Sequence, residues 1–253
     1  MATSVRSSSR LFRGVGAFFG TELRVQLHES TAILTSMIVQ GVLLVFVTIL
    51  DPSLLPVALM GALIFSVFQM GQRIQNEAAY VRIDHKLNEL YLASPMTAEA
   101  YFLGMAGGIL LAYFPPILVL ALITELLVTM SWLTWLVVIL TAGAVWIFAV
   151  SVGYIISTFF RDMRAIWPYA SLFYNLFGVL PPVFYPLHTF TPALQPLALV
   201  LPPSAATAII NQVRIGGVLS TDWAILAVTA LIVEAVATFV IAVWWARRTV
   251  RME

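Results

Sequence analysis

The chain has 253 residues, of which 61% are hydrophobic and 10% are charged, with a formal net charge of +1 and no cysteine. Because soluble domains carry about 25% charged residues, this composition excludes a water-soluble globular protein and predicts an integral membrane protein. The nearly neutral charge gives no sign of a nucleic-acid-binding patch. The lack of cysteine excludes disulfides, thiolate zinc sites and cysteine nucleophiles.

The N-terminal segment, residues 1–29, carries an amphipathic pattern. Apolar side chains recur every four residues between Arg10 and His28, at Leu11, Val15, Phe19, Leu23 and Leu27. Arginines occupy much of the opposite face. This pattern is typical of a helix that lies in the headgroup layer of a membrane. The alternative is a plain basic anchor that only sets the orientation of the chain.

After this segment come six apolar stretches, each long enough to cross a hydrocarbon core about 30 Å thick. They cover residues 31–50, 54–70, 102–129, 133–160, 165–185 and 223–246. We expect helices, because every backbone N–H and C=O in lipid needs an internal partner and the alternation of barrel strands is missing. The sequence therefore predicts an all-α, six-span transmembrane domain over residues 30–253.

The basic residues indicate how these six helices are oriented. Twelve of the 13 Lys and Arg residues fall before the first span, after the last span, or in the loops after the second and fourth. Arg214 alone falls on the other face. Positive charge gathers on the cytoplasmic side of membrane proteins. We therefore expect both termini in the cytoplasm and a location in the inner (cell) membrane of a prokaryote.

The cytoplasmic loop between the second and third spans holds a second amphipathic segment, from Asn76 to Ser94. Its apolar stripe comprises Tyr80, Ile83, Leu87, Leu90 and Tyr91, and charged residues lie around the rest. Pro95 ends the expected helix, because the residue before a proline disfavours the α region. A helix of this kind is suited to docking on another protein. The alternative is a solvated helix that packs on its own bundle.

Prolines are expected to bend or break the helices in two other parts of the chain. Pro115 and Pro116 lie in the middle of the third span and should kink it. Seven prolines crowd into residues 181–203, at the start of the long outer connection between the fifth and sixth spans. That connection is nearly uncharged, so we expect it to be broken into short pieces and to re-enter the membrane in part, shielded by protein.

The sequence shows no catalytic constellation. The three histidines are scattered, so a three-histidine metal site is not expected. The single lysine, Lys86, lies between His85 and Leu87, whereas a P-loop needs Gly-Lys-Ser/Thr. From the sequence we therefore expect the chain to have no metal site, no catalytic residue and no cofactor of its own. An ATP-driven role would need a separate ATPase chain, which would bind ATP and Mg²⁺.

Two carboxylates interrupt the apolar spans. Glu234 lies near the middle of the sixth span, and Glu125 lies near the outer end of the third. An ionised carboxylate at the membrane centre is costly and by default indicates a functional residue, so both are candidates for a transport path. The alternative is a neutral glutamate that bonds to a neighbouring helix.

The order of these features resembles that of type-2 ABC exporter permeases. Residues 82–95 are similar to the family's Gly-Thr-Leu-Glu-x-Leu-x-x-Ser/Thr-Pro run, with Glu89, Ser94 and Pro95 at the matching spacing. Lys86 stands where the family has glycine. Residues 178–186 and 201–203 look like the family's fifth span and outer re-entrant region. The six-span plan and the basic N-terminal helix are similar as well, so the likeness covers nearly the whole chain.

The resemblance implies a permease subunit that pairs with a second permease copy or paralogue and binds two cytoplasmic ABC ATPase subunits. The helix 76–94 would be the coupling helix, with its ATPase contact at Arg82, Lys86, Leu87, Glu89, Leu90, Ser94 and Pro95. Arg161, Asp162 and Arg164 would form a second contact. The expected activity is export of a hydrophobic or lipid-linked substrate, such as a drug, lipid or glycan, by alternating access.

Three other interpretations of the sequence stay open. A proton-coupled secondary transporter would use Glu234 and Glu125 and need no ATP. A membrane enzyme is disfavoured, because no cluster of His, Asp or Lys gathers at one interface. A purely structural membrane subunit would show no substrate-stimulated turnover with any partner. Membrane lipids surround the protein in every case.

Overall fold

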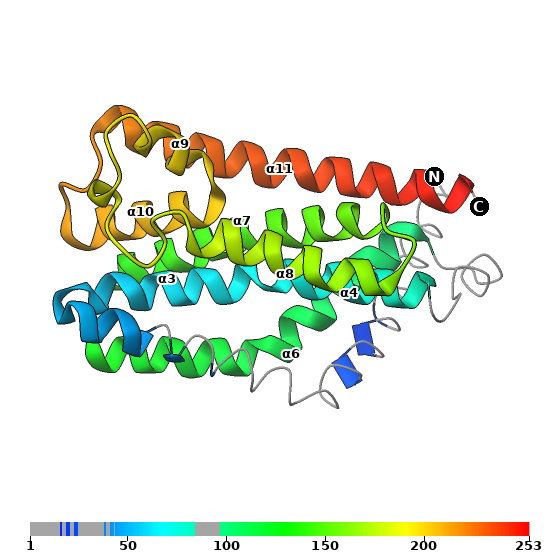
Figure 1. Ribbon diagram of the computed structural model, residues 1–253, viewed down its shortest axis with the longest axis horizontal. Helices are drawn as coiled ribbons and strands as arrows, with labels where there is room; N and C mark the ends of the chain where they lie inside the picture. The colour runs from blue at the N-terminus through cyan, green and yellow to red at the C-terminus, as the bar shows by residue number, and fades with distance from the viewer. Residues whose placement is uncertain are drawn as a thin grey trace, which may run out of the picture.

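The computed structural model describes residues 44–83 and 97–252, together with positions 16, 19–20, 23–24, 38 and 41–42. Every element in these ranges is a helix, and the helices form an elongated bundle (Figure 1). Among the described residues, four helical stretches are long and apolar enough to cross a membrane, namely Pro52–Ile83, Glu99–Leu127, Trp132–Ser157 and Thr221–Arg248. The prediction of an all-helical membrane protein is thereby confirmed.

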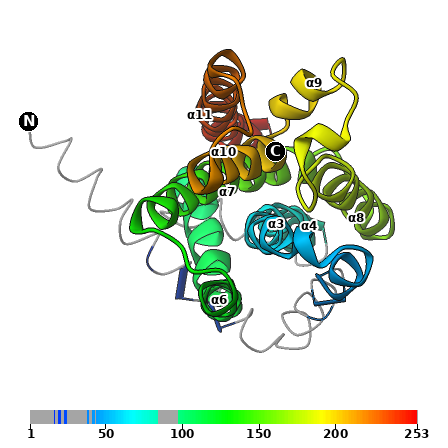
Figure 2. The same ribbon diagram turned by 90° about the vertical axis from the view of Figure 1, so that its left-hand side faces the viewer.

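The first of these stretches lies at the centre of the bundle. It consists of η1 (Pro52–Leu54), α3 (Leu55–Phe68) and α4 (Met70–Ile83). The Asp51 side chain begins it by accepting a hydrogen bond from the Ser53 amide at 2.9 Å. Helices α6, α7, α8 and α10 lie around α3 and α4, whereas α9 and α11 lie farther out (Figure 2). As a result, 72% of the apolar part of this stretch is buried inside the protein.

Helices α6 (Ala98–Leu127) and α7 (Trp132–Ser157) each begin at a hydroxyl N-cap. Thr97 accepts from the Ala100 amide at 3.2 Å, and Ser131 accepts from the Thr134 amide at 3.1 Å. Helix α6 continues through Pro115 and Pro116 and is bent along its length (Figure 1). Two consecutive prolines remove two backbone donors from the helix, which explains such a bend.

Helix α8 (Met163–Val179) is shorter than the fifth predicted span of 165–185. It ends before Pro181 and Pro182, which cannot donate to the helix. The chain beyond is broken, as the prolines require, into η2 (Leu187–Thr189), α9 (Gln195–Val200) and α10 (Pro202–Ile215). Helix α10 ends at Gly216 and Gly217, whose φ values of 70° and 67° favour glycine. The last helix is α11 (Thr221–Met252).

Two glycines allow α4, α7 and α8 to approach closely. A Cβ on Gly71 would lie 2.5 Å from the Tyr174 hydroxyl, and a Cβ on Gly153 would lie 2.8 Å from Ile74 Cγ2 and collide with the Gly71 carbonyl. Tyr174 is fully buried and donates to the Ala149 carbonyl at 3.0 Å. Small residues at helix crossings let backbones pack closely in membrane proteins.

Three of the predicted elements lie wholly or partly outside the described residues. These are most of the N-terminal interfacial helix, half of the first span at 31–50 and residues 84–94 of the helix 76–94, whose first residues, 76–83, form the end of α4. The six-span topology and the re-entry of the outer segment stay predictions.

Candidate functional site

Arginines gather at one end of the bundle, on the right in Figure 1. The ends of α4, α7 and α11 and the start of α8 meet there. The described arginines at this end include Arg82, Arg161, Arg164, Arg247 and Arg248, whereas Arg214 lies in the last turn of α10, toward the opposite end. We treat this basic end as the candidate functional site, because Arg82 of the first predicted ATPase contact and all three residues of the second lie there.

The central contact of this end is made by Arg82, in the last turn of α4. Its guanidinium donates to three backbone carbonyls. Nη2 lies 2.6 Å from the carbonyl oxygens of both Ser157 and Phe160, and Nη1 lies 2.9 Å from that of Thr158. The last carbonyls of an α-helix have no partner within the helix, and they lie at the negative end of its dipole. Arg82 thus supplies a C-terminal cap for α7 from another helix.

The remaining carbonyls of the last turn of α7 are also paired. The Ser157 hydroxyl donates to the Tyr154 carbonyl at 2.6 Å, and the Thr158 hydroxyl donates to the Ile155 carbonyl at 2.7 Å. Trp245 of α11 donates its indole N–H to the Thr158 hydroxyl at 2.9 Å. Helices α4, α7 and α11 are therefore joined at a single turn.

The turn between α7 and α8 presents the second predicted contact. Asp162 caps α8 by accepting from the Arg164 amide at 2.9 Å. The residues Arg161, Asp162 and Arg164 are all exposed. The structure thus brings Arg82, from the first predicted contact, beside the turn that carries the second. The other residues of the first contact, Lys86, Leu87, Glu89, Leu90, Ser94 and Pro95, lie outside the described residues.

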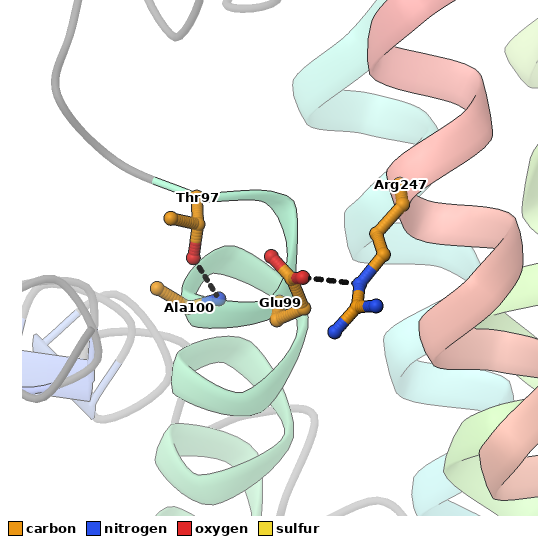
Figure 3. A network of polar contacts seen from close by, with 4 residues as sticks. All are labelled: Thr97, Glu99, Ala100 and Arg247. Atoms are coloured by element: carbon orange, nitrogen blue, oxygen red, sulfur yellow. Dashed lines mark hydrogen bonds and ion pairs between the residues drawn. The ribbon is translucent and has the colours of Figure 1, made fainter. Parts of the chain in front are cut away.

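An ion pair links α6 to α11 at the same end. Glu99, in the first turn of α6, points toward Arg247 of α11 and accepts from its Nε (Figure 3). The Arg247 side chain is 61% exposed, so water weakens this pair.

A polar strip runs between α8 and the junction of α3 with α4, and the sequence reasoning missed it. Gln69 donates to Asn175 at 3.2 Å, and Gln72 donates to the Ser171 hydroxyl at 2.8 Å. Asn175 is exposed, although it lies within an otherwise largely apolar helix. An amide side chain in contact with lipid is costly, so this face is better suited to a polar surrounding than to lipid. The signal available in the sequence was the presence of amides within or beside apolar spans.

The two carboxylates predicted to line a path lie in different surroundings. Glu125 accepts from the Trp135 indole at 2.7 Å. Glu234 is half-buried in α11, and its Oε2 is buried without a hydrogen-bond partner in the described part of the chain. The two glutamates thus occupy separate environments on different helices. Within the described ranges, no cluster of three or more His, Asp or Glu side chains could hold a metal ion.

No family model matches the chain, and no curated protein is detectably similar to it in sequence.

Proposed function

We propose that this chain is the permease subunit of an ATP-driven exporter, with both termini in the cytoplasm. Separate ABC ATPase subunits supply ATP hydrolysis, and a second permease copy or paralogue completes the membrane part. The substrate class is hydrophobic or lipid-linked. Substrate crosses by alternating access, driven by closure of the ATPase subunits against the basic end.

The observation that supports this proposal best is that Arg82, the first residue of one predicted ATPase contact, lies beside the turn that carries the other. Arg82 bonds directly to the turn that leads to the exposed Arg161, Asp162 and Arg164. An ATPase that bound at the end of α4 would therefore also lie beside the α7–α8 turn. The absence of a P-loop from the sequence is consistent with this division of labour.

The polar strip between α8 and the junction of α3 with α4 is a second supporting observation. Gln69, Gln72, Ser171 and Asn175 hydrogen-bond along a face that is partly exposed. A substrate path needs polar groups of this kind to hydrate or bind the polar part of a cargo, whereas lipid contact does not.

Co-purification tests the proposal directly. The chain is expressed with a P-loop ATPase encoded by a neighbouring gene, purified, and placed in lipid vesicles. We expect a stable complex whose ATP hydrolysis rises with the substrate and drives its transport. A wild-type chain that binds no such ATPase, or that moves cargo alone, would contradict the proposal.

A paired variant locates the ATPase contact. Leu87→Glu with Leu90→Glu places charge on the predicted apolar stripe and should abolish coupling between hydrolysis and export. Asn88→Glu adds charge on the polar face of the same segment and is the matched control. Unchanged coupling in the leucine variant would exclude residues 76–94 as the coupling helix.

The unpartnered Oε2 of Glu234 favours one alternative, a proton-coupled transporter. In that case a pH gradient alone would drive uptake into vesicles. Glu234→Gln would abolish uptake, because the amide cannot carry a proton, while Glu125→Gln is the comparison at the carboxylate that Trp135 already binds. Dependence on ATP would exclude this alternative.

A further inference from the structure

We infer that Arg82 makes the end of α4, where the first predicted ATPase contact begins, and the α7–α8 turn, which carries the second, move as one unit. Its guanidinium holds the α7–α8 turn against the end of α4, and so sets the position of residues 161–164 relative to the last turn of α4. This inference rests on the proposed function and deepens it. It assigns Arg82 a positioning role within the chain, in place of direct contact with the ATPase.

The geometry of the contact supports this role. Ser157 is the last residue of α7, Thr158 is its C-cap, and Phe160 lies in the turn that leads to α8. Arg82 bonds to the carbonyls of all three at 2.6–2.9 Å. One side chain therefore spans the helix end and the turn together. The end of α4 cannot shift against this turn without breaking three hydrogen bonds.

Arginine is required here for two physical reasons. Its planar fork presents five N–H donors in fixed directions, so it can reach three carbonyls at once, whereas lysine is a single flexible point charge. The residues after Ser157 are Thr158, Phe159 and Phe160, so α7 has no glycine for a left-handed C-cap of its own. Without the guanidinium, the carbonyls that it caps lose their charged partner.

A second contact extends the unit to α11. The Trp245 indole donates to the Thr158 hydroxyl at 2.9 Å, and the same hydroxyl donates to the Ile155 carbonyl. A displacement of the end of α4 is thus carried to α7, to the start of α8 and to α11. Under the proposed function, this carries the movement of the ATPase subunits to three membrane helices together.

The first test uses the purified full chain without any partner. Arg82→Gln removes the charge and the fork, and amide hydrogen exchange is followed by mass spectrometry in lipid nanodiscs. We expect residues 155–164 to exchange at least about tenfold faster than in the wild type. Residues 205–215 in α10, near the opposite end, should be unchanged. Unchanged exchange over 155–164 would overturn the inference.

Two further variants keep this test decisive. Arg248→Gln removes one positive charge from the same end of the bundle and is the control. The Arg248 Cζ lies 5.2 Å from the centroid of the Trp244 ring, so this variant should leave the hydrogen exchange of residues 155–164 unchanged. Arg82→Lys keeps the charge without the fork and should give an intermediate increase. If Arg82→Gln does not fold, Arg82→Lys carries the test, and a wild-type exchange pattern in that variant would overturn the inference.

The second test uses the complex with the ATPase. We expect Arg82→Gln to co-purify with the ATPase and to keep the KM for ATP, but to lose most substrate movement per ATP hydrolysed. Arg248→Gln should retain coupling. Full coupling in Arg82→Gln together with faster exchange would overturn the inference. If no ATPase binds even the wild type, the proposed function fails, and the coupling role fails with it. The exchange result would still show whether Arg82 holds the turn.

Discussion

Helices α3 and α4 are central and α11 is peripheral, yet α11 is the more apolar. The less apolar helices are therefore the more deeply buried ones. The stretch Pro52–Ile83 has a mean hydropathy of 1.9 over its apolar part and is 72% buried there, whereas Thr221–Arg248 reaches 2.5 and is 17% buried. In water the more apolar helix would be the core. In lipid, apolar surface need not be hidden, and the helix with glycines and amides is drawn to the centre.

The largest difference in the free energy of unfolding is expected when an isoleucine is shortened to alanine in each helix. Ile64 of α3 is fully buried, and Ile232 of α11 is 54% exposed. We expect Ile64→Ala to lower the free energy of unfolding by about 3 kcal/mol, because it leaves a cavity. Ile232→Ala should change it by less than about 0.5 kcal/mol. Reversible unfolding in mixed micelles measures both, and equal effects would contradict the central placement of α3.

Replacing a glycine at the α4–α7 crossing by alanine tests how closely the central helices pack. Gly153→Ala should destabilise the protein by about 2 kcal/mol, since the new methyl collides with the Gly71 backbone. A methyl group added at Gly143, in the same helix, would meet no described atom within 4 Å, so Gly143→Ala is the control and should be neutral or slightly stabilising. Thermal unfolding in detergent separates the two variants. A tolerant Gly153 would show that the helices are farther apart than described.

A smaller effect is expected at the fully buried tyrosine beside this crossing. Tyr174→Phe removes the hydrogen bond to the Ala149 carbonyl and should cost about 1 kcal/mol. Tyr169→Phe, on the exposed side of α8, is the matched control and should cost nothing measurable. Unfolding in the same micelles compares them, and equal losses would contradict the burial of Tyr174.

The smallest effect is expected at the rim of α11. Glu99→Gln breaks the ion pair with Arg247, which is largely exposed, so the loss should be at most about 0.5 kcal/mol and should shrink as salt is added. Unfolding of the wild type and the variant at low and high salt measures this loss. A large, salt-independent loss would mean that α11 is held more tightly to α6 than its exposure indicates.

The sequence predicted part of the candidate site. Arg161, Asp162 and Arg164 were placed in the loop after the fourth span because they interrupt an apolar run, and the structure has them exposed in the α7–α8 turn. The three bonds of Arg82 could not be predicted in this way. They join residues more than 70 positions apart, and the carbonyls that accept them belong to the backbone, which carries no sequence signal. The pairing of Gln69 with Asn175 was missed because it too joins residues far apart in the chain.

Composition and hydropathy by themselves determined that this protein is helical and crosses a membrane, because lipid offers the backbone no hydrogen-bond partner. Local chemistry also determined several helix limits, through the caps at Thr97, Ser131 and Asp162 and the prolines after α8. Only the tertiary structure decided which apolar helix is central and which arginine caps another helix. Hydropathy reports transfer out of water, and lipid and protein interior are equally apolar destinations, so the choice between them rests on packing and on the pairing of distant polar groups.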